Sequence, residues 1–289
     1  SRHSITPFRL TFNVLRNPTA AFDTLRAENP ALYVSLRDQF IPAMEYTYTY
    51  DNASVRGKRN PIWWQTTVAS AGNLTSAVYR IFGKPFSEEG KKLFGVPFAQ
   101  FLKLNSEFRY HYRIDKNQMI ASRIAGRGDM VVWQRYDRTL YGNSSISVVP
   151  NSVRAFSARS IGPGGYPPET DRKYTYINHV GDIRMEANIE YRFRMIADLY
   201  GAVFLDAGNV WLMRKDENRP NGEFTLKNFP KQIALGTGFG LRYDLDFLVF
   251  RLDLGIGLHD PYDTGKSGYY NIPKFKDSMA LHFAIGYPF

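Results

Sequence analysis

The chain has 289 residues, a formal net charge of +10 and no cysteine. Hydrophobic residues make up 44% of it and charged residues 22%, which excludes a disordered chain and a helical membrane bundle. The lack of cysteine excludes a disulfide scaffold, a cysteine-ligated zinc site and thiol catalysis. Aromatic residues reach 15% of this polar chain, and an outer-membrane β-barrel, with an apolar lipid face and a polar lumen, explains that combination better than a soluble domain does.

Alternation of apolar and polar residues predicts about ten strands along the chain. The clearest segment is 183–193, where every odd position is apolar and every even position is polar or charged. A soluble sandwich strand is the alternative for one such segment, but several segments are about 10–13 residues long, as a tilted strand that crosses a bilayer must be. The predicted strands are 5–14, 43–51, 62–71, 101–114, 118–127, 182–194, 198–212, 231–245, 247–259 and 278–289.

The connections between these strands alternate in length as they do in outer-membrane barrels. Short links at 115–117 and 243–246 are predicted to be periplasmic turns. Long polar segments are predicted to be outer loops, at 128–181, 213–230 and 260–276. Residues 17–39 interrupt the strand rhythm and favour a short helical insertion, with a partner-binding or surface helix as the weaker alternative. We find no linker between domains, so residues 1–289 are predicted to belong to one β-barrel domain.

The last predicted strand alternates up to the final residue. One face of it carries Leu281, Phe283, Ile285, Tyr287 and Phe289. Gly286 belongs to the other face, and Pro288 has no N–H, so strand pairing is expected to be poor near this end. A terminal aromatic residue in an alternating strand resembles the signal that the outer-membrane barrel-assembly machinery recognises. The alternative is an ordinary sheet strand that happens to be the last.

Two further segments resemble motifs of one family. Residues 204–211 look like an F-x-D-x-G motif, whose positions are filled by Phe204, Asp206 and Gly208. Residues 151–156, followed by 159–164, resemble a V-R-G-F/Y loop motif, whose positions are filled by Val153, Arg154, Ala155 and Phe156. Both motifs occur in the BamA/TamA superfamily of outer-membrane assembly factors and two-partner secretion transporters. Their order and their spacing from the C-terminus make the resemblance specific, and it covers essentially the whole chain.

The resemblance implies an all-β transmembrane antiparallel barrel of about sixteen strands with periplasmic POTRA domains before it. Residues 71–74 and the general run of residues 3–40 look most like the surface-antigen-type, TamA-like members of the superfamily from Bacteroidetes-type bacteria. We therefore expect residues 1–289 to be the C-terminal part of the barrel, without the POTRA domains and the first strands. The expected location is the outer membrane of a Gram-negative bacterium.

The resemblance also implies a function, which is the insertion or translocation of outer-membrane proteins through a weak barrel seam and an in-folded loop. The implied partners are outer-membrane lipid and lipopolysaccharide, unfolded outer-membrane protein clients, and periplasmic or inner-membrane assembly partners. No bond is made or broken in this function, so the chain is expected to be no enzyme and to need no cofactor. The alternatives are a passive pore or substrate-specific channel, which requires an unobstructed lumen, and an outer-membrane hydrolase, which requires a histidine-centred cluster.

The motif residues suggest a specific contact inside the barrel. Asp206 lies on the opposite face of its strand from an apolar set, so it is expected to face the lumen. An unpaired carboxylate in a confined lumen is costly, so a cation should meet it. The family supplies that partner, Arg154, whose loop folds back into the barrel. Alternatively, Arg154 lies in a solvated outer loop and Asp206 faces water.

Glycines on the lumen faces of two neighbouring strands would leave room for such a loop. They are Gly236, Gly238, Gly240, Gly255 and Gly257. The alternative is that they relieve crowding or permit strand curvature. The loop departs from the family pattern at Ala155, where glycine is usual, and the added methyl group could shift the loop.

Other chemistry has little support in the sequence. The histidines lack the spacing of a metal site, so no metal is predicted. The basic excess could suggest nucleic acid, but in an outer-membrane protein these residues fit the lumen, the rim or lipopolysaccharide phosphates better, and no nucleic-acid partner is predicted.

Overall fold

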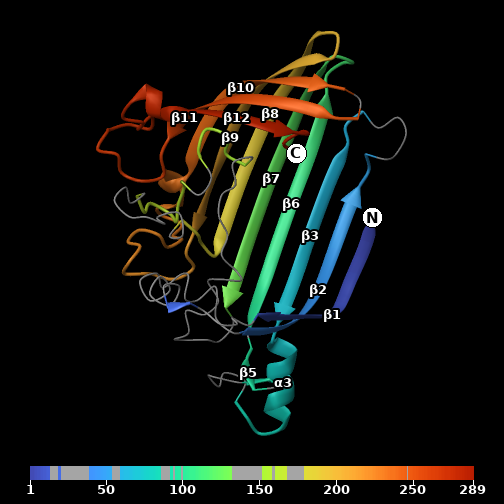
Figure 1. The fold of residues 1–289 in the computed structure, drawn as a ribbon, viewed down its shortest axis with the longest axis vertical. Coiled ribbons are helices and arrows are strands. Elements are labelled where there is room, and N and C mark those ends of the chain that lie inside the picture. Colours follow the sequence, from blue (N-terminus) through green and yellow to red (C-terminus); the bar gives the residue numbers. More distant parts are fainter. Residues whose placement is uncertain are drawn as a thin grey trace. The chain divides into compact units, whose positions relative to one another are not determined.

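A computed structural model describes residues 1–13, 19–20, 39–53, 59–85, 92–93, 95–98, 100–131, 152–157, 160–167, 179–245 and 247–289. Within these ranges, ten long strands form one sheet in the order β1-β2-β3-β6-β7-β8-β9-β10-β11-β12 (Figure 1). In this described part of the chain, no helix combines the length and the apolar composition that a membrane span requires.

The strands of this sheet match the predicted segments one by one. They are β1 (Arg2–Asn13), β2 (Gln39–Asp51), β3 (Ile62–Ala71), β6 (Phe101–Arg113), β7 (Gln118–Val131), β8 (Ile183–Ile196), β9 (Leu199–Trp211), β10 (Ala234–Asp244), β11 (Val249–His259) and β12 (Met279–Ile285). The all-β fold is therefore confirmed. Five short elements were not predicted from the sequence: α3 (Asn73–Ile81), β4 (Lys92–Leu93), β5 (Val96–Pro97), and the 3₁₀ turns η3 (Phe229–Gln232) and η4 (Phe275–Ser278).

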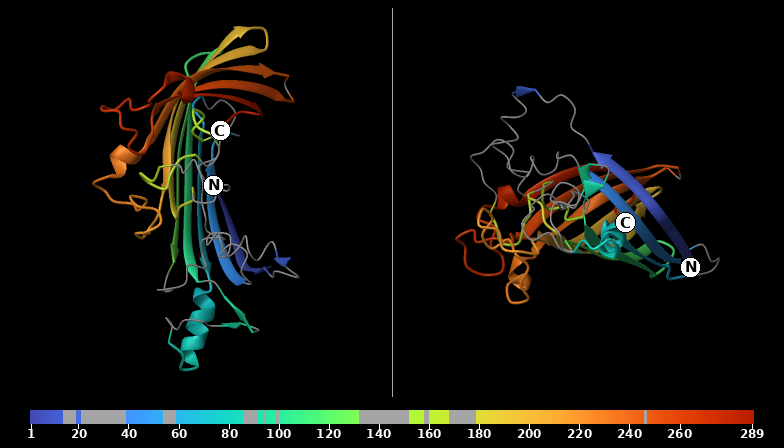
Figure 2. Two further views of the ribbon diagram at one scale, coloured as in Figure 1. Left: turned by 60° about the vertical axis from the view of Figure 1, so that its left-hand side comes forward. Right: turned by 90° about the horizontal axis from the view of Figure 1, so that it is seen from below.

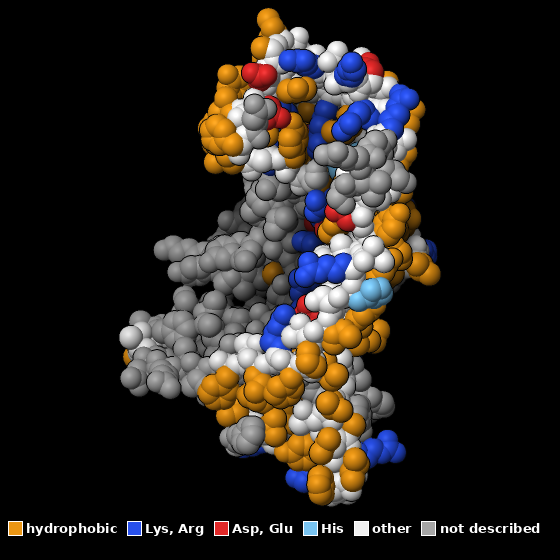
Figure 3. Space-filling model, turned by 90° about the vertical axis from the view of Figure 1, so that its right-hand side faces the viewer, with side chains coloured by type: hydrophobic (Ala, Val, Ile, Leu, Met, Phe, Trp, Pro, Cys, Tyr) orange, Lys and Arg blue, Asp and Glu red, His pale blue; other side chains and the backbone are white. Residues whose placement is uncertain are grey.

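The chain divides into two compact units. The first unit contains 1–49, 66–105 and 127–145. In it, β1 pairs antiparallel with β2, and α3 continues the chain beyond the end of β3 (Figure 2). Hydrophobic side chains gather at the lower end of the molecule in Figure 3, where Figure 1 places α3.

The second unit contains 50–65, 106–126 and 146–289. Its strands β8 to β12 pair antiparallel in sequence order. Their polar faces are buried and their apolar faces are exposed: Ile189 on β8 is 46% exposed, whereas its neighbour Glu190 is fully buried. A sheet is inverted in this way when lipid covers its apolar face. Asp206 lies on the buried polar face, as the alternation predicts.

The last strand is shorter than predicted. β12 ends at Ile285 because Gly286, with φ +89°, turns the chain, and Pro288 has no N–H for a strand ladder. The ring of Phe289 packs 5.5 Å from the guanidinium carbon of Arg192, and only 8% of Phe289 is exposed. The prediction that Phe289 continues the apolar face of the strand is therefore wrong. The part of that face within β12 is exposed as predicted, at Leu281, Phe283 and Ile285. Tyr287 lies beyond the strand, and the centre of its ring is 4.6 Å from the guanidinium carbon of Arg192.

Several predicted boundaries also move. β7 continues to Val131, so the following loop begins later than residue 128. β10 continues to Asp244, inside the predicted turn 243–246, and in the link to β11 Leu245 N–H donates to the Leu248 carbonyl. β2 begins at Gln39, inside the predicted insertion 17–39, and the remainder of that insertion, apart from 19–20, lies outside the described residues.

Candidate functional site

Arg154 lies against β9 with its side chain fully buried. Its Nε donates to Asp206 Oδ2 at 2.8 Å, its Nη2 donates to Oδ1 at 2.9 Å, and its backbone N–H donates to Oδ2 at 3.1 Å. The planar guanidinium fork favours this two-pronged contact with a carboxylate. The structure therefore brings together two residues that are 52 positions apart and that the sequence analysis paired.

Each position of the F-x-D-x-G motif contacts the loop. The ring of Phe204 lies 3.5 Å from the guanidinium carbon of Arg154, which is a cation–π contact. At Gly208, a Cβ atom would lie only 3.2 Å from Cγ2 of Val153. Alternate residues of a strand share one face. The loop therefore meets the ring of Phe204, the carboxylate of Asp206 and, at Gly208, the space left by the missing side chain.

The loop itself forms a tight turn that carries Arg154. Phe156 N–H donates to the Val153 carbonyl at 3.1 Å, and Val153 is fully buried with Ile161, Val210 and Ala234 in a small apolar cluster that Phe156 covers. Residues 151 and 158–159 lie outside the described part of the chain.

Asn188 on β8 holds both the loop and the carboxylate. Its Nδ2 donates to the Ser152 carbonyl and, at 2.9 Å, to Asp206 Oδ1. Asn188 and Asp206 are direct neighbours across the β8–β9 pair, so one amide group can reach both acceptors. Asn188 therefore orients the carboxylate that Arg154 binds.

Three of the five predicted glycines of β10 and β11 lie beside the loop. Gly236 and Gly255 have no side chain where Ala155 approaches: a Cβ at Gly255 would lie 2.7 Å from Ala155 Cα, and one at Gly236 would overlap the Ala155 methyl group. A Cβ at Gly257 would make ordinary contact, 3.6 Å from the Phe156 ring. Gly236 and Gly255 therefore make room for the loop, which favours the first of the two interpretations left open by the sequence at these positions. Cβ atoms at Gly238 and Gly240 would instead meet Phe204 and Asp253 of the neighbouring strands, so these two glycines do not make room for the loop.

Glu190 on β8 is the centre of a buried charge network. Its Oε2 accepts hydrogen bonds from Arg154 Nη1 and, at 3.2 Å, from Arg242 Nη2. Its Oε1 accepts a hydrogen bond from Arg192 Nε at 2.7 Å. One carboxylate therefore connects the loop arginine to arginines of β8 and β10.

Asp253 on β11 extends this network. Its Oδ1 lies 2.6 Å from Arg242 Nη1 and its Oδ2 lies 3.0 Å from Arg251 Nε, at angles that make these contacts ion pairs rather than hydrogen bonds. Four positive and three negative charges leave a formal net charge of +1, from Arg154, Arg192, Arg242, Arg251, Glu190, Asp206 and Asp253. Removing any of the carboxylates leaves a buried arginine less compensated, which is costly.

Four residues of the site were not predicted from the sequence: Asn188, Glu190, Arg242 and Asp253. The signal for the first two was their position on the charged face of the segment 183–193. Alternation tells which face of a strand a residue occupies, but it does not tell which residue of a loop lies over it.

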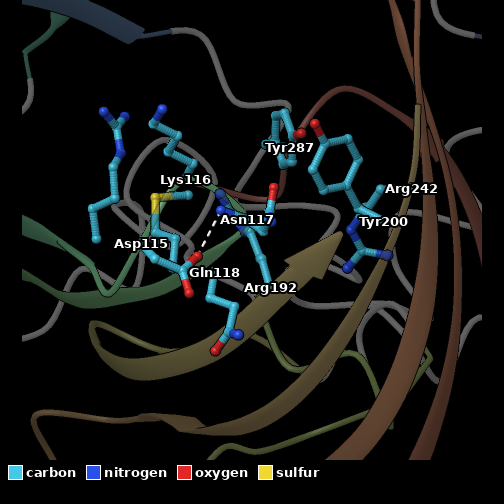
Figure 4. Close-up of a pocket in the computed structure, with 10 residues that line it drawn as sticks. Asp115, Lys116, Asn117, Gln118, Arg192, Tyr200, Arg242 and Tyr287 are labelled. Atoms are coloured by element: carbon cyan, nitrogen blue, oxygen red, sulfur yellow. Dashed lines mark hydrogen bonds between the residues drawn. The ribbon is translucent and has the colours of Figure 1, made fainter. Parts of the chain in front are cut away.

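A hollow of about 330 Å³ lies at the turn between β6 and β7. Figure 4 shows Asn117, Arg192, Tyr200 and Arg242 around it, with the backbone of Asn117 bonded to Asp115. Two of the arginines that line it, Arg192 and Arg242, are already paired with the network carboxylates Glu190 and Asp253. Among the described residues, no group of three His, Asp or Glu side chains is placed to hold a metal ion.

Comparisons with known proteins add a family and a fold. Residues 93–289 match the model of the Omp85 superfamily domain. The structure is similar to that of BamA from Haemophilus ducreyi lacking POTRA domains 1-3, with a TM-score of 0.54 and 13% identity over 87% of this chain and 44% of that one. CdiB from Acinetobacter baumannii matches with a TM-score of 0.45 and 12% identity, over 85% of this chain and 33% of that one. No curated protein matches the sequence. The chain thus spans less than half the length of either solved protein.

Proposed function

The chain belongs to the Omp85 superfamily, and on that premise we propose that it acts in the insertion or translocation of outer-membrane proteins. It lies in the outer membrane of a Gram-negative bacterium, where its exposed apolar strand faces meet lipid. Its partners are unfolded outer-membrane proteins and the periplasmic or inner-membrane factors that deliver them. The residues of the site bind and position polypeptide and carry out no covalent step.

The observation that carries this proposal is the contact between Arg154 and Asp206. Both side chains are fully buried, so the loop is held against the polar face of the sheet instead of extending into water. The guanidinium group of Arg154 binds both oxygens of the Asp206 carboxylate, and this buried ion pair keeps the loop in place. Moving the loop away would break the pair and leave the buried carboxylate without a compensating positive charge. A passive pore would need this face of the sheet clear of the loop, which makes the pore the less favoured alternative.

We further propose that residues 1–289 are the C-terminal part of a larger barrel that POTRA domains precede. The similarity covers 87% of this chain and only 44% of the BamA chain, which supports the view that residues 1–289 are part of a larger protein. β12 ends the strand order of the described sheet, and the N–H and C=O groups of such an edge seek partners. A client strand could add to this edge by β-augmentation, which is the role that we assign to the seam.

The test is Arg154→Ala in a reconstituted or cellular outer-membrane protein assembly assay. Arg219→Ala is the matched control, because Arg219 is also a loop arginine with two bonds to one carboxylate, Asp216. We expect Arg154→Ala to lose client assembly while Arg219→Ala retains it, at equal amounts of heat-modifiable, folded barrel. Normal assembly by folded Arg154→Ala would refute the loop mechanism, and a large steady ion conductance of the unmodified protein would favour the pore.

A further inference from the structure

The helix α3 is bonded to the protein through its polar side. Asn73 Nδ2 donates to the Ser70 hydroxyl at 2.9 Å and to the Phe101 carbonyl at 3.1 Å. Ser76, which is fully buried, donates to Gln100 Oε1 at 2.9 Å. One turn later, Tyr79 donates to a backbone carbonyl at 2.7 Å and its ring stacks on another ring. The side of the helix that faces the protein is therefore polar.

The opposite side of α3 is apolar and has no cover among the described residues. Its large side chains, together with that of the C-cap residue Phe82, recur at the i, i+4, i+7 and i+8 positions that share one helix face. Leu74 is 59% exposed, Val78 44%, Ile81 81% and Phe82 80%. A helix on a water-soluble protein turns such a face inward. In α3 the polar side faces the protein and the apolar side is exposed, as in the strands of the barrel.

The exposed face of α3 continues the lipid-facing surface of its own unit. In β3 and β6, which flank the helix in the chain, Val68 is 38% exposed, Leu102 37% and Leu104 51%. The space-filling view shows hydrophobic side chains continuing to this end of the molecule, with Lys and Arg side chains at their margin (Figure 3). An apolar helix face that adjoins the lipid-facing strands has the bilayer as its neighbour.

The position of α3 in the chain fixes the side of the membrane. β6 ends at the short turn 114–117, closed by the hydrogen bond from Ile114 N–H to the Gln118 carbonyl, and α3 precedes the other end of β6. Short turns of outer-membrane barrels lie on the periplasmic side, so α3 lies at the outer end.

Two basic residues lie at the C-terminal end of the helix. Arg80 lies in the last turn of α3, and Lys84 follows it with its ammonium group 5.7 Å from the ring centre of Tyr79. Both are exposed. Interfacial helices combine an apolar face in the acyl region with Lys and Arg that reach lipid phosphates.

We propose that α3 is an interfacial helix that lies in the outer leaflet, with Leu74, Val78, Ile81 and Phe82 among the acyl chains and Arg80 and Lys84 at lipid phosphate groups. The proposal depends on the membrane location of the chain and is independent of its role in protein assembly. It assigns α3 the task of fixing the outer end of β3 and β6 at the membrane surface.

The absence of cysteine allows a direct test by single-cysteine labelling of the full chain. Leu74→Cys and Ile81→Cys, labelled with a polarity-sensitive dye, are reconstituted in vesicles of phosphatidylethanolamine and phosphatidylglycerol with a doxyl-acyl lipid. Arg80→Cys is the matched control on the same helix. Val68→Cys on β3 reports lipid insertion of the strands, and the measurement uses preparations in which its label is quenched by the doxyl lipid.

We expect the labels at 74 and 81 to emit at shorter wavelength and to be quenched by the doxyl lipid, and the label at 80 to be quenched by aqueous iodide instead. Labels at 74 and 81 that iodide reaches as well as it reaches 80 would overturn the proposal. So would labels shielded from both quenchers, because protein would then cover the face. In the second arm, Arg80→Glu with Lys84→Glu should reduce doxyl quenching at 81 in phosphatidylglycerol vesicles, and unchanged quenching would refute the phosphate contact.

Discussion

The methyl group of Ala155 occupies the space that a side chain at Gly236 would need. Gly236 pairs with Asp206 across β9 and β10, so this close contact lies directly beside the carboxylate that Arg154 binds. In the described part of the chain, the residues other than glycine with positive φ are Ala197 and Asn221, so Ala155 has ordinary backbone geometry. The glycines of the sheet therefore accommodate the methyl group that replaces the usual glycine of the loop motif.

Gly236→Ala should displace the loop, and Ala155→Gly should restore it. Overpacking of this kind costs about 1–3 kcal/mol, and we expect that loss in the free energy of unfolding, measured by denaturant titration in detergent micelles. The double variant Gly236→Ala with Ala155→Gly should recover most of it. Gly126→Ala is the control, because a Cβ at Gly126 would have nothing within 4 Å. Equal losses in the single and double variants would contradict the contact.

Arg154 and Asp206 should be strongly coupled in a double-mutant cycle. Removing either partner of a buried ion pair costs about 3–5 kcal/mol, and the Arg154→Ala, Asp206→Ala double variant should lose much less than the sum of the two single losses. Arg154→Lys should not restore stability, since a single ammonium group cannot reproduce the two-pronged contact. Additive losses in the unfolding titration would show that the two residues do not interact.

Glu190→Gln should destabilise the protein more than loss of a surface carboxylate does. The change removes a negative charge that three buried arginines share, so the formal net charge of the network rises by one. Glu45→Gln is the control, because Glu45 pairs with the exposed Arg9 and such surface pairs contribute about 0–1 kcal/mol. Equal unfolding free energies of the two variants would argue against a structural role for the network.

Tyr262, which lies in the segment between β11 and η4, should lose its phenolic proton at a higher pH than an ordinary tyrosine does. Burial, the charge of Asp260 and a hydrogen bond to it raise the pKa of Tyr262 to about 12. Because the folded-state pKa is raised above the ordinary value of about 10, this group contributes stability below about pH 10 that is lost as the pH rises through 12. Asp260→Asn should lower the pKa of Tyr262, measured by NMR of labelled tyrosine; an unchanged pKa would exclude the contact with Asp260.

Alternation predicted the ten strands well because membrane strands meet two different environments. Lipid on one side and polar groups on the other impose the period of two on every strand, and that period is a property of the local sequence. The end of β12 departed from it because one glycine with positive φ breaks the strand while the alternation of residue types continues.

The sequence also determined the partners Arg154 and Asp206, through a resemblance between motifs rather than through periodicity. It left the roles of Asn188, Glu190 and Gly236 undecided. Those roles depend on which residues lie opposite one another across neighbouring strands and under a folded loop, and such contacts join positions tens of residues apart. In α3, the helical spacing of apolar residues was present in the sequence, but only the tertiary structure decided that its polar side binds the protein and its apolar side faces outward. Local sequence determines the faces of an element, whereas the packing of distant segments decides what each face contacts.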